Sequence, residues 1–268
     1  MLAALVRRDA AVRVFARDGD QAAALAGLGA TESAVGDLHS EADLLRATLQ
    51  IESVYHICPN MHADEAEIGF SLLEAARANG VRRFVYHSVL HPQTEEMAHH
   101  WQKLRVEEAL FKSGLDFTIL QPAPYMQNLL PAWTGIVQEG CYRIPYGAHT
   151  RLSLIDLGDV AEIGATVLLD AGHEGATYEL AGTVALSQSQ VAATFAQELG
   201  QPVKVAPMDY TVWSASARRN GMSDYAVNSL IAMFRYYEDY GLAGNPRVAQ
   251  MLLGRPPTTL SEFVRQQL

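Results

Sequence analysis

Short β-rich runs alternate with helical segments through the first half of the chain, and this alternation constrains the fold more than any other feature. Strands are expected at residues 12–16, 33–35, 53–58, 83–87 and 116–120, and helices at 20–28, 41–50, 65–79 and 95–113. Strands separated by helices of this length form βαβ units, and right-handed crossovers then build a parallel sheet with helices on both faces. The expected fold class is therefore α/β, with a doubly wound, mostly parallel sheet.

The second half of the sequence is less regular. Loops, prolines and aromatic residues dominate from Pro122 to about Gly147. Beyond them we expect short strands at 153–155, 177–180 and 203–206, helices at 156–169 and 187–199, and mainly helical structure in the last sixty residues. Ser261 followed by Glu262 indicates a capped final helix. This half is expected to be an irregular lobe of the same structural unit rather than an independent domain.

Composition and charge exclude several classes of protein. The formal net charge is −10, which argues against a nucleic-acid-binding surface. Two cysteines, Cys58 and Cys141, cannot form a disulfide framework, so a reducing compartment is expected. The longest uncharged stretch, 117–138, contains three prolines and is not a membrane span. The first residues lack the pattern of a signal peptide, so we expect a cytoplasmic protein.

An ordered set of segments resembles the NmrA-like branch of the atypical short-chain dehydrogenase/reductases. The set includes VRVFARDGDQAAAL, VRRFVYHSV, HHWQKLRVEEALFKSGLDFTILQPAPYMQNLL, YRIPYG, GATYELAG and GRPPTTLSEFV. The resemblance implies a Rossmann-type domain that binds NADP or NAD. Members of the family include quinone and dye reductases as well as redox-sensing regulators. It implies an NAD(P)-binding region at residues 1–124 and a substrate-covering lobe at 125–268.

One part of the family pattern is missing from this sequence. The family opens with a strand, a GxxGxxG loop and a helix, whereas the first glycine here is Gly19, after the first readable strand. Residues 1–10 are similar to the end of that first helix. We therefore expect the natural chain to begin about 15–25 residues earlier. Without the first strand, either a gap remains between strands 12–16 and 53–58, or these two strands pair directly.

Residues at three strand ends are candidates for the cofactor's adenosine half and backbone. Arg17 could bind a 2′-phosphate and so favour NADP over NAD; the alternative is a solvated loop arginine. By the resemblance, Asp37 and Leu38 would contact the adenine, although Asp37 could equally cap the next helix. The strand-end residues Cys58, Pro59 and Asn60 would contact the cofactor through their backbone. Cys58 is not expected to act as a nucleophile, because the sequence places no base beside it.

The catalytic candidates are Lys103, His99 and Ser88. Lys103 and His99 are four residues apart and share a helix face. In related reductases this spacing holds a Tyr and a Lys, so Lys103 would bind the nicotinamide ribose, and His99 would stand at the tyrosine position as a general acid. The alternatives are a surface lysine and a structural histidine. Ser88 matches a hydroxyl that orients a carbonyl in the wider superfamily, or it is a loop or cap serine.

The turn after the strand at 116–120 is expected to wrap the nicotinamide end. Its residues are Tyr125, Met126, Gln127 and Asn128. Gln121 stands where many relatives carry Arg. A group of aromatic residues near the C-terminus could line a substrate pocket or form plain core: Phe234, Tyr236, Tyr237 and Tyr240.

The histidine spacing does not predict a metal site. Six of the nine histidines fall between His56 and His100, but no Cys–His or HExxH spacing occurs. Taken together, the residues and the resemblance predict an NAD(P)H-dependent oxidoreductase that transfers hydride to a small planar acceptor such as a quinone, as a monomer or homodimer. The alternatives are a non-catalytic NADP-binding regulator that binds a partner protein, and a structural relic without cofactor.

Overall fold

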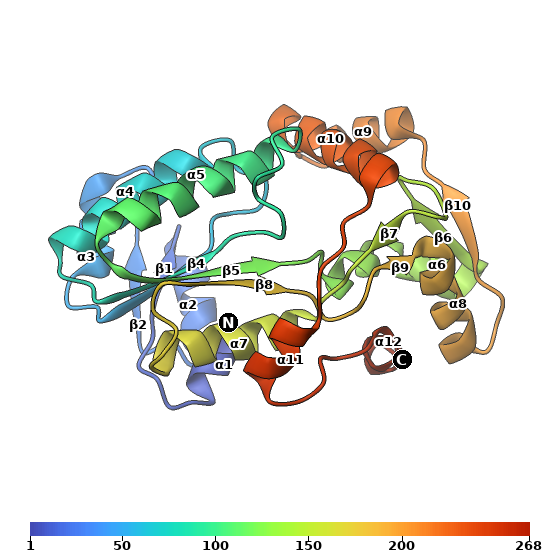
Figure 1. The fold of residues 1–268 in the computed structure, drawn as a ribbon. Helices are drawn as coiled ribbons and strands as arrows, with labels where there is room; N and C mark the ends of the chain where they lie inside the picture. The colour runs from blue at the N-terminus through green and yellow to red at the C-terminus, as the bar shows by residue number, and fades with distance from the viewer.

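A four-stranded parallel sheet lies at the centre of the computed structural model, which describes residues 1–268 (Figure 1). The order is β3-β4-β5-β8, and these strands span Ser53–His56, Arg83–His87, Asp116–Pro122 and Ala176–Leu180. Two more strands, β1 (Arg13–Ala16) and β2 (Glu32–Val35), form a separate parallel pair. The expected α/β class with a mostly parallel sheet is confirmed.

Helices cover both faces of the sheet (Figure 1). In this view α3 (Glu41–Thr48), α4 (Glu65–Ala78) and α5 (Ala98–Ser113) lie above it. Below it lie α1 (Leu2–Val6), α7 (Leu157–Leu169) and α11 (Arg247–Leu253). Helix α2 (Gly19–Gly27) connects β1 to β2. Helix α5 begins three residues later than expected, because residues 95–97 form a turn before it.

Successive side chains of β4 point to opposite faces of the sheet and pack into the apolar core on each face. All five residues of β4 are buried. Phe84 and Tyr86 belong to the apolar core under α4 and α5, whereas Val85 belongs to the core on the α7 side. Helices α4 and α5 approach closely at Gly69, where a Cβ atom would lie 2.6 Å from Cγ2 of Val106. The missing side chain at this position therefore sets the spacing of the two helices.

No hydrogen bonds between strands join the β1–β2 pair to the four-stranded sheet, and we call the boundary between these two sheets the seam. Strands β1 and β3 do not pair, so their direct pairing, one of the two expected outcomes, is wrong. Three of the four residues in β1 and in β3 are only half-buried, unlike those of β4. The two sheets are joined on one face by α3, whose Leu44 is part of the core under α4 and α5.

The second half of the chain forms the lobe on the right of Figure 1. Its strands are β6 (Cys141–Ile144) with β10 (Lys204–Pro207), and β7 (Arg151–Leu152) with β9 (Leu186–Ser187). Its helices are η1 (Met126–Ala132), α6 (Trp133–Glu139), α8 (Gln188–Leu199), α9 (Tyr210–Arg219), α10 (Asp224–Tyr240) and α12 (Leu260–Gln266). A third apolar core, containing Phe195 and Phe263, holds much of this lobe together.

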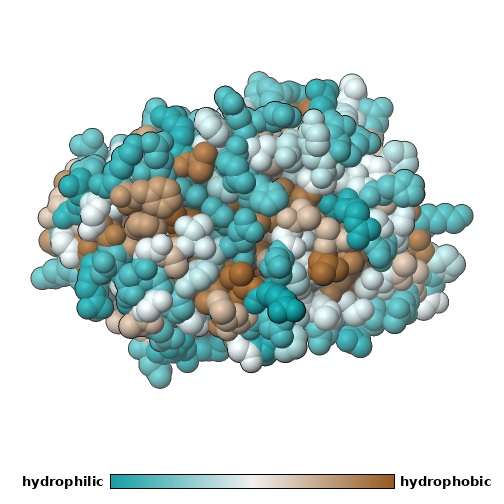
Figure 2. Space-filling view, in the orientation of Figure 1, coloured by the Kyte–Doolittle hydropathy of each residue, from teal (hydrophilic) through white to brown (hydrophobic).

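The lobe and the sheet are interleaved along the chain. The strand expected at 177–180 pairs with β5 and so becomes the edge of the central sheet. Helix α11, late in the sequence, belongs with α7 to the core below the sheet. The final helix is capped by Thr259 in a capping box with Glu262, two residues before the expected Ser261. None of the helices has the length and apolarity needed to span a bilayer. On the face of the molecule shown in Figure 2, apolar residues form separate patches.

Candidate active site

Polar side chains gather where β3, β4 and β5 end, which is the edge of a parallel sheet that commonly binds ligands. The first group surrounds Glu65, a buried residue in the first turn of α4. Its Oε1 accepts hydrogen bonds from the Tyr86 hydroxyl and from Lys103 Nζ, both at 2.9 Å. Lys103 also donates to the His87 carbonyl oxygen at 3.3 Å. Lys103 is therefore not a surface lysine, since its ammonium group is held at the end of β4 with one N–H unassigned.

A second group, on the opposite face of the sheet, links β3 and β4 to the turn that follows β5. The ring of His87 lies between two tyrosines, with Nδ1 2.7 Å from the Tyr55 hydroxyl and Nε2 2.6 Å from the Tyr125 hydroxyl. Burial lowers the pKa of His87 to about 3, so the ring is neutral near pH 7. A neutral imidazole donates from one nitrogen and accepts at the other, so one tyrosine donates to the ring and the other accepts from it.

Sequence reasoning missed Tyr55 and His87 as site residues. The strand register contains the relevant information, because Tyr55 lies opposite Val85, two residues before His87 on the same face of the sheet. Diagonal neighbours of this kind are within reach of aromatic side chains. Tyr125 was expected in the cofactor turn, and the structure connects it to the sheet through His87.

Ser88 hydrogen-bonds to a buried carboxylate on α5. Its hydroxyl donates to Glu107, and Gln121 Nε2 donates to the two oxygens of the same carboxylate at 3.0 and 2.9 Å. All three residues are buried. Burial raises the pKa of Glu107. The Ser88 proton is thus used within the protein interior, and Gln121 serves as a donor to the buried carboxylate.

His99 lies on the same helix as Lys103, as expected, but its ring is buried. Its Nδ1 has no hydrogen-bond partner, and the ring packs edge-on against His100 with centroids 4.4 Å apart. Burial, followed by the neighbouring His100 and Lys103, lowers the pKa of His99 to about 3. The protonation change that would make His99 an acid is thereby moved well below neutral pH.

His99 is one of four buried histidines with lowered pKa values. Burial is the largest cause in each case, and it lowers the pKa of His56 and His100 to about 4. The four buried histidines are His56, His87, His99 and His100.

The remaining turn residues have different environments. The side chain of Met126 is fully buried in the core of the lobe. Gln127 bonds to α7, donating to Asp156 at 2.7 Å and accepting from the Leu157 backbone at 3.1 Å. Asn128 is exposed. The turn is therefore fixed to α7 and leaves Tyr125 and Asn128 for contact with a ligand.

The candidates for the adenosine half are more exposed. The Arg17 side chain is 84% exposed, and its guanidinium contacts only Asp18, through Nε at 3.0 Å. Asp37 is exposed and accepts from the backbone and ring of His39, at 2.9 and 3.1 Å. Leu38 packs against the core under α4 and α5.

Residues 58–60 continue the same edge. Cys58 is buried, and burial raises the pKa of its thiol, which agrees with its expected lack of nucleophilic character. Pro59 and Asn60 are exposed.

Three of these candidates, Asp37, Lys103 and Tyr125, belong to one line of hydrogen bonds along the edge of the sheet, which we call the polar line. Asp37 bonds to His39, which bonds to Asp64, the residue before Glu65. Glu65 accepts a hydrogen bond from Lys103, and Lys103 donates another to the carbonyl oxygen of His87. The ring of His87 in turn bonds to the hydroxyl of Tyr125. Arg17 stands outside this polar line, because its side chain bonds only to its neighbour.

Comparisons with known proteins place the chain in a family. The model of the NmrA-like family matches residues 1–264. Quinone oxidoreductase 2 of Escherichia coli strain K12 is 28% identical over 244 residues, covering 91% of this chain and 84% of the relative. NAD(P)H azoreductase of Xenophilus azovorans is 27% identical over 255 residues, covering 94% and 88%.

Solved structures agree with the sequence comparison. The crystal structure of NADPH-dependent quinone oxidoreductase QOR2 from Escherichia coli complexed with NADPH matches with a TM-score of 0.86 and 26% identity, covering 98% of this chain and 93% of that one. Triphenylmethane reductase from Citrobacter sp. complexed with NADP(H) has a TM-score of 0.84 at 21% identity, covering 100% and 95%, which shows a shared fold. This chain belongs to the NmrA-like family.

Proposed function

We propose that the protein is an NAD(P)H-dependent oxidoreductase that transfers hydride to a small planar acceptor such as a quinone. The observation that carries the proposal is the polar line from Asp37 to Tyr125 at the carboxyl ends of the parallel strands. This edge is where doubly wound folds bind dinucleotides. Membership of the family, and the similarity to an NADPH-complexed quinone oxidoreductase, support the same reading.

The side chains present fit the two ends of a phosphorylated dinucleotide. At one end, Arg17 has both terminal guanidinium nitrogens free of protein partners, as a 2′-phosphate ligand requires. At the other end, Lys103 is fixed by two acceptors and retains one N–H for a ribose hydroxyl. When bound, the reduced nicotinamide supplies the hydride.

Reduction of a quinone to a hydroquinone requires a proton as well as a hydride. We assign this proton to the Tyr125 hydroxyl, which His87 holds at 2.6 Å. Tyr55, on the other side of the ring, hydrogen-bonds to Nδ1 and so fixes the orientation of the His87 ring, and Tyr125 regains its proton from water after the hydroquinone leaves. Tyr125 has a raised pKa because it is buried, so the hydroxyl carries its proton at neutral pH. The neutral, buried His99 is less suited to this task.

The test is NADPH consumption with a panel of quinones and azo or triphenylmethane dyes, beside a titration of NADP by calorimetry. We expect turnover with at least one acceptor, and about a 100-fold lower kcat for Tyr125→Phe with little change in NADP affinity. Tyr210→Phe, in the lobe and with a hydroxyl bonded to the Pro145 carbonyl, is the matched control. Absence of NADP binding would contradict the proposal.

A regulator that binds NADP without catalysis is the second candidate. The observation in its favour is His99, which occupies the position of the tyrosine in related reductases but is buried and neutral. This candidate predicts NADP binding with no turnover on any acceptor of the panel, and no effect of Tyr125→Phe in either measurement.

A further inference from the structure

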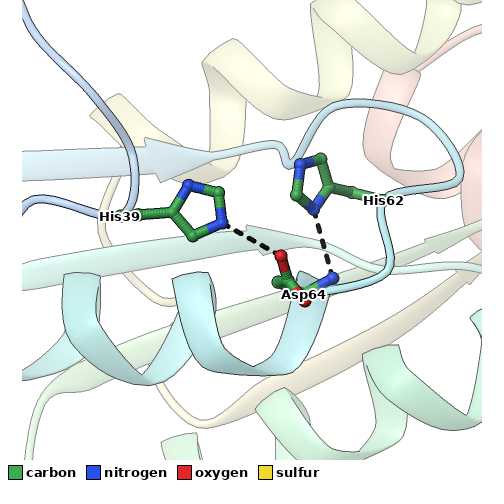
Figure 3. A group of neighbouring side chains, drawn as sticks. All are labelled: His39, His62 and Asp64. Carbon is green, nitrogen blue, oxygen red and sulfur yellow. Dashed lines mark hydrogen bonds and ion pairs between the residues drawn. The ribbon is translucent and has the colours of Figure 1, made fainter.

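Two histidines and an aspartate converge near the seam, and two of them, His39 and Asp64, also belong to the Asp37 end of the polar line (Figure 3). His39 lies in the loop after β2, whereas His62 and Asp64 lie in the loop between β3 and α4. One potential ligand atom from each residue lies within 4.8 Å of the other two. His39 Nε2 is 3.1 Å from Asp64 Oδ2, and His62 Nδ1 accepts from the Asp64 backbone N–H at 3.2 Å. From these three side chains we propose a binding site for a divalent transition-metal ion of the zinc type.

The donor set matches that class of ion. Two imidazole nitrogens and one carboxylate oxygen suit zinc and its neighbours, whereas Mg²⁺ and Ca²⁺ prefer oxygen ligands alone. Tetrahedral coordination with ligands about 2.0–2.1 Å from the ion places them about 3.3 Å apart. The separation of 3.1 Å between His39 and Asp64 already meets this requirement. The His62 ligand atom, now within 4.8 Å of the other two, would have to move closer, and binding through Nδ1 would replace its hydrogen bond from the Asp64 backbone.

Asp37 supplies the outer support that metal-binding histidines usually have. Its Oδ1 lies 3.1 Å from His39 Nδ1 and also accepts from the His39 backbone at 2.9 Å. A carboxylate at Nδ1 holds the proton there and directs the lone pair of Nε2 toward the ion. No lysine or arginine forms an ion pair with Asp37 or Asp64. A dication would therefore meet two carboxylates that no lysine or arginine neutralises.

The location gives the site a structural consequence. The loop carrying His39 follows the two-stranded sheet, and the loop carrying His62 and Asp64 follows the first strand of the four-stranded sheet. An ion bound by both loops would link the two sheets across the seam, where no strand hydrogen bonds do so. Because the ion binds the folded arrangement, it should stabilise the protein in proportion to the logarithm of its concentration.

The experiment uses the untagged chain after treatment with a chelator. Zn²⁺ is titrated by calorimetry, and Co²⁺ is added separately to record the visible spectrum of its coordination sphere. We expect one ion per chain, a tetrahedral Co²⁺ spectrum, and a higher melting temperature with Zn²⁺. His62→Ala and Asp64→Asn should abolish stoichiometric binding, and Asp37→Asn should weaken it about 10- to 100-fold.

His149→Ala is the matched control, since His149 is an exposed histidine of the lobe, away from the cluster. It should bind Zn²⁺ as the parent chain does. Circular dichroism shows whether each variant is folded, and His62→Gln provides a second test of that ligand if His62→Ala is not. Failure of the parent chain to bind Zn²⁺ stoichiometrically would overturn the proposal. So would binding that survives both His62→Ala and Asp64→Asn.

Discussion

Replacing Lys103 by Met should lower both stability and NADPH binding, and the two effects can be separated. Lys103 and Glu65 form a buried ion pair, with side chains 15% and 5% exposed. The substitution leaves the Glu65 carboxylate in the interior with only the Tyr86 hydroxyl as a strong donor. Removing one partner of a buried pair costs about 3–5 kcal/mol. For a chain of this size each kcal/mol lowers Tm by about 2–4 °C, so Tm should fall by roughly 6–20 °C.

The double variant Lys103→Met with Glu65→Gln separates stability from function. It removes both charges and keeps an acceptor for Tyr86, so most of the lost stability should return. NADPH affinity and turnover should stay low, because the ammonium group is still missing. A purely structural lysine would instead recover function together with stability.

The assays are thermal unfolding followed by circular dichroism, NADPH titration, and turnover with the accepted quinone or dye. Lys112→Met is the control, because Lys112 lies on the same helix in an exposed pair with Glu108 and should change stability by less than about 1 kcal/mol. A Tm for Lys103→Met equal to that of Lys112→Met would refute the buried pair as the source of the effect.

Three further predictions test other parts of the structure. Arg17→Glu should weaken NADP binding far more than NAD binding, as measured by calorimetry, and equal weakening would remove Arg17 from 2′-phosphate recognition. Gly69→Ala should lower the free energy of unfolding in urea by about 1–3 kcal/mol, because the added Cβ meets Val106 at 2.6 Å. The double variant Gly69→Ala with Val106→Ala should be no less stable than Gly69→Ala alone. An unchanged free energy of unfolding for Gly69→Ala would refute the tight helix contact. The four buried histidines have pKa values lowered to about 3 or 4, so the unfolded chain binds more protons below pH 6.5 and stability should fall as pH drops from 6.5 toward 4. His87→Gln should make the slope of that fall shallower by up to about 1.4 kcal/mol per pH unit, whereas His149→Ala, at an exposed site, should leave it unchanged.

The sequence was sufficient to predict the layers of the fold because strands and helices leave local patterns. The short runs rich in aromatic and β-branched residues at β4 and β5, and the helical stripe at α4, each depend on neighbouring residues only. The position of β8 was predicted but its place in the central sheet was not, since pairing with β5 is set by contacts across more than fifty residues of chain.

Residues of the candidate site that lie at strand ends could be predicted from the sequence. The side chains to which they hydrogen-bond could not. Lys103 was singled out by its helix face and motif, but its carboxylate partner lies 38 positions away in the sequence. An acidic residue in the first turn of a helix, such as Glu65, is ordinarily explained by the helix dipole. The acceptor of Ser88 is similarly hidden, because Glu107 resembles a surface residue of an amphipathic helix until the sheet is packed against it.

The seam also affects how cooperatively the protein opens. The backbone amides of a central strand such as β4 bond alternately to its two neighbours, so the whole strand is released to solvent only when it separates from both. Strands β1 and β2 are hydrogen-bonded only to each other, so they can open together while the four-stranded sheet remains intact. Hydrogen exchange should therefore divide the chain into two units of different protection, and the loop carrying Asp37 and His39 belongs to the less protected one.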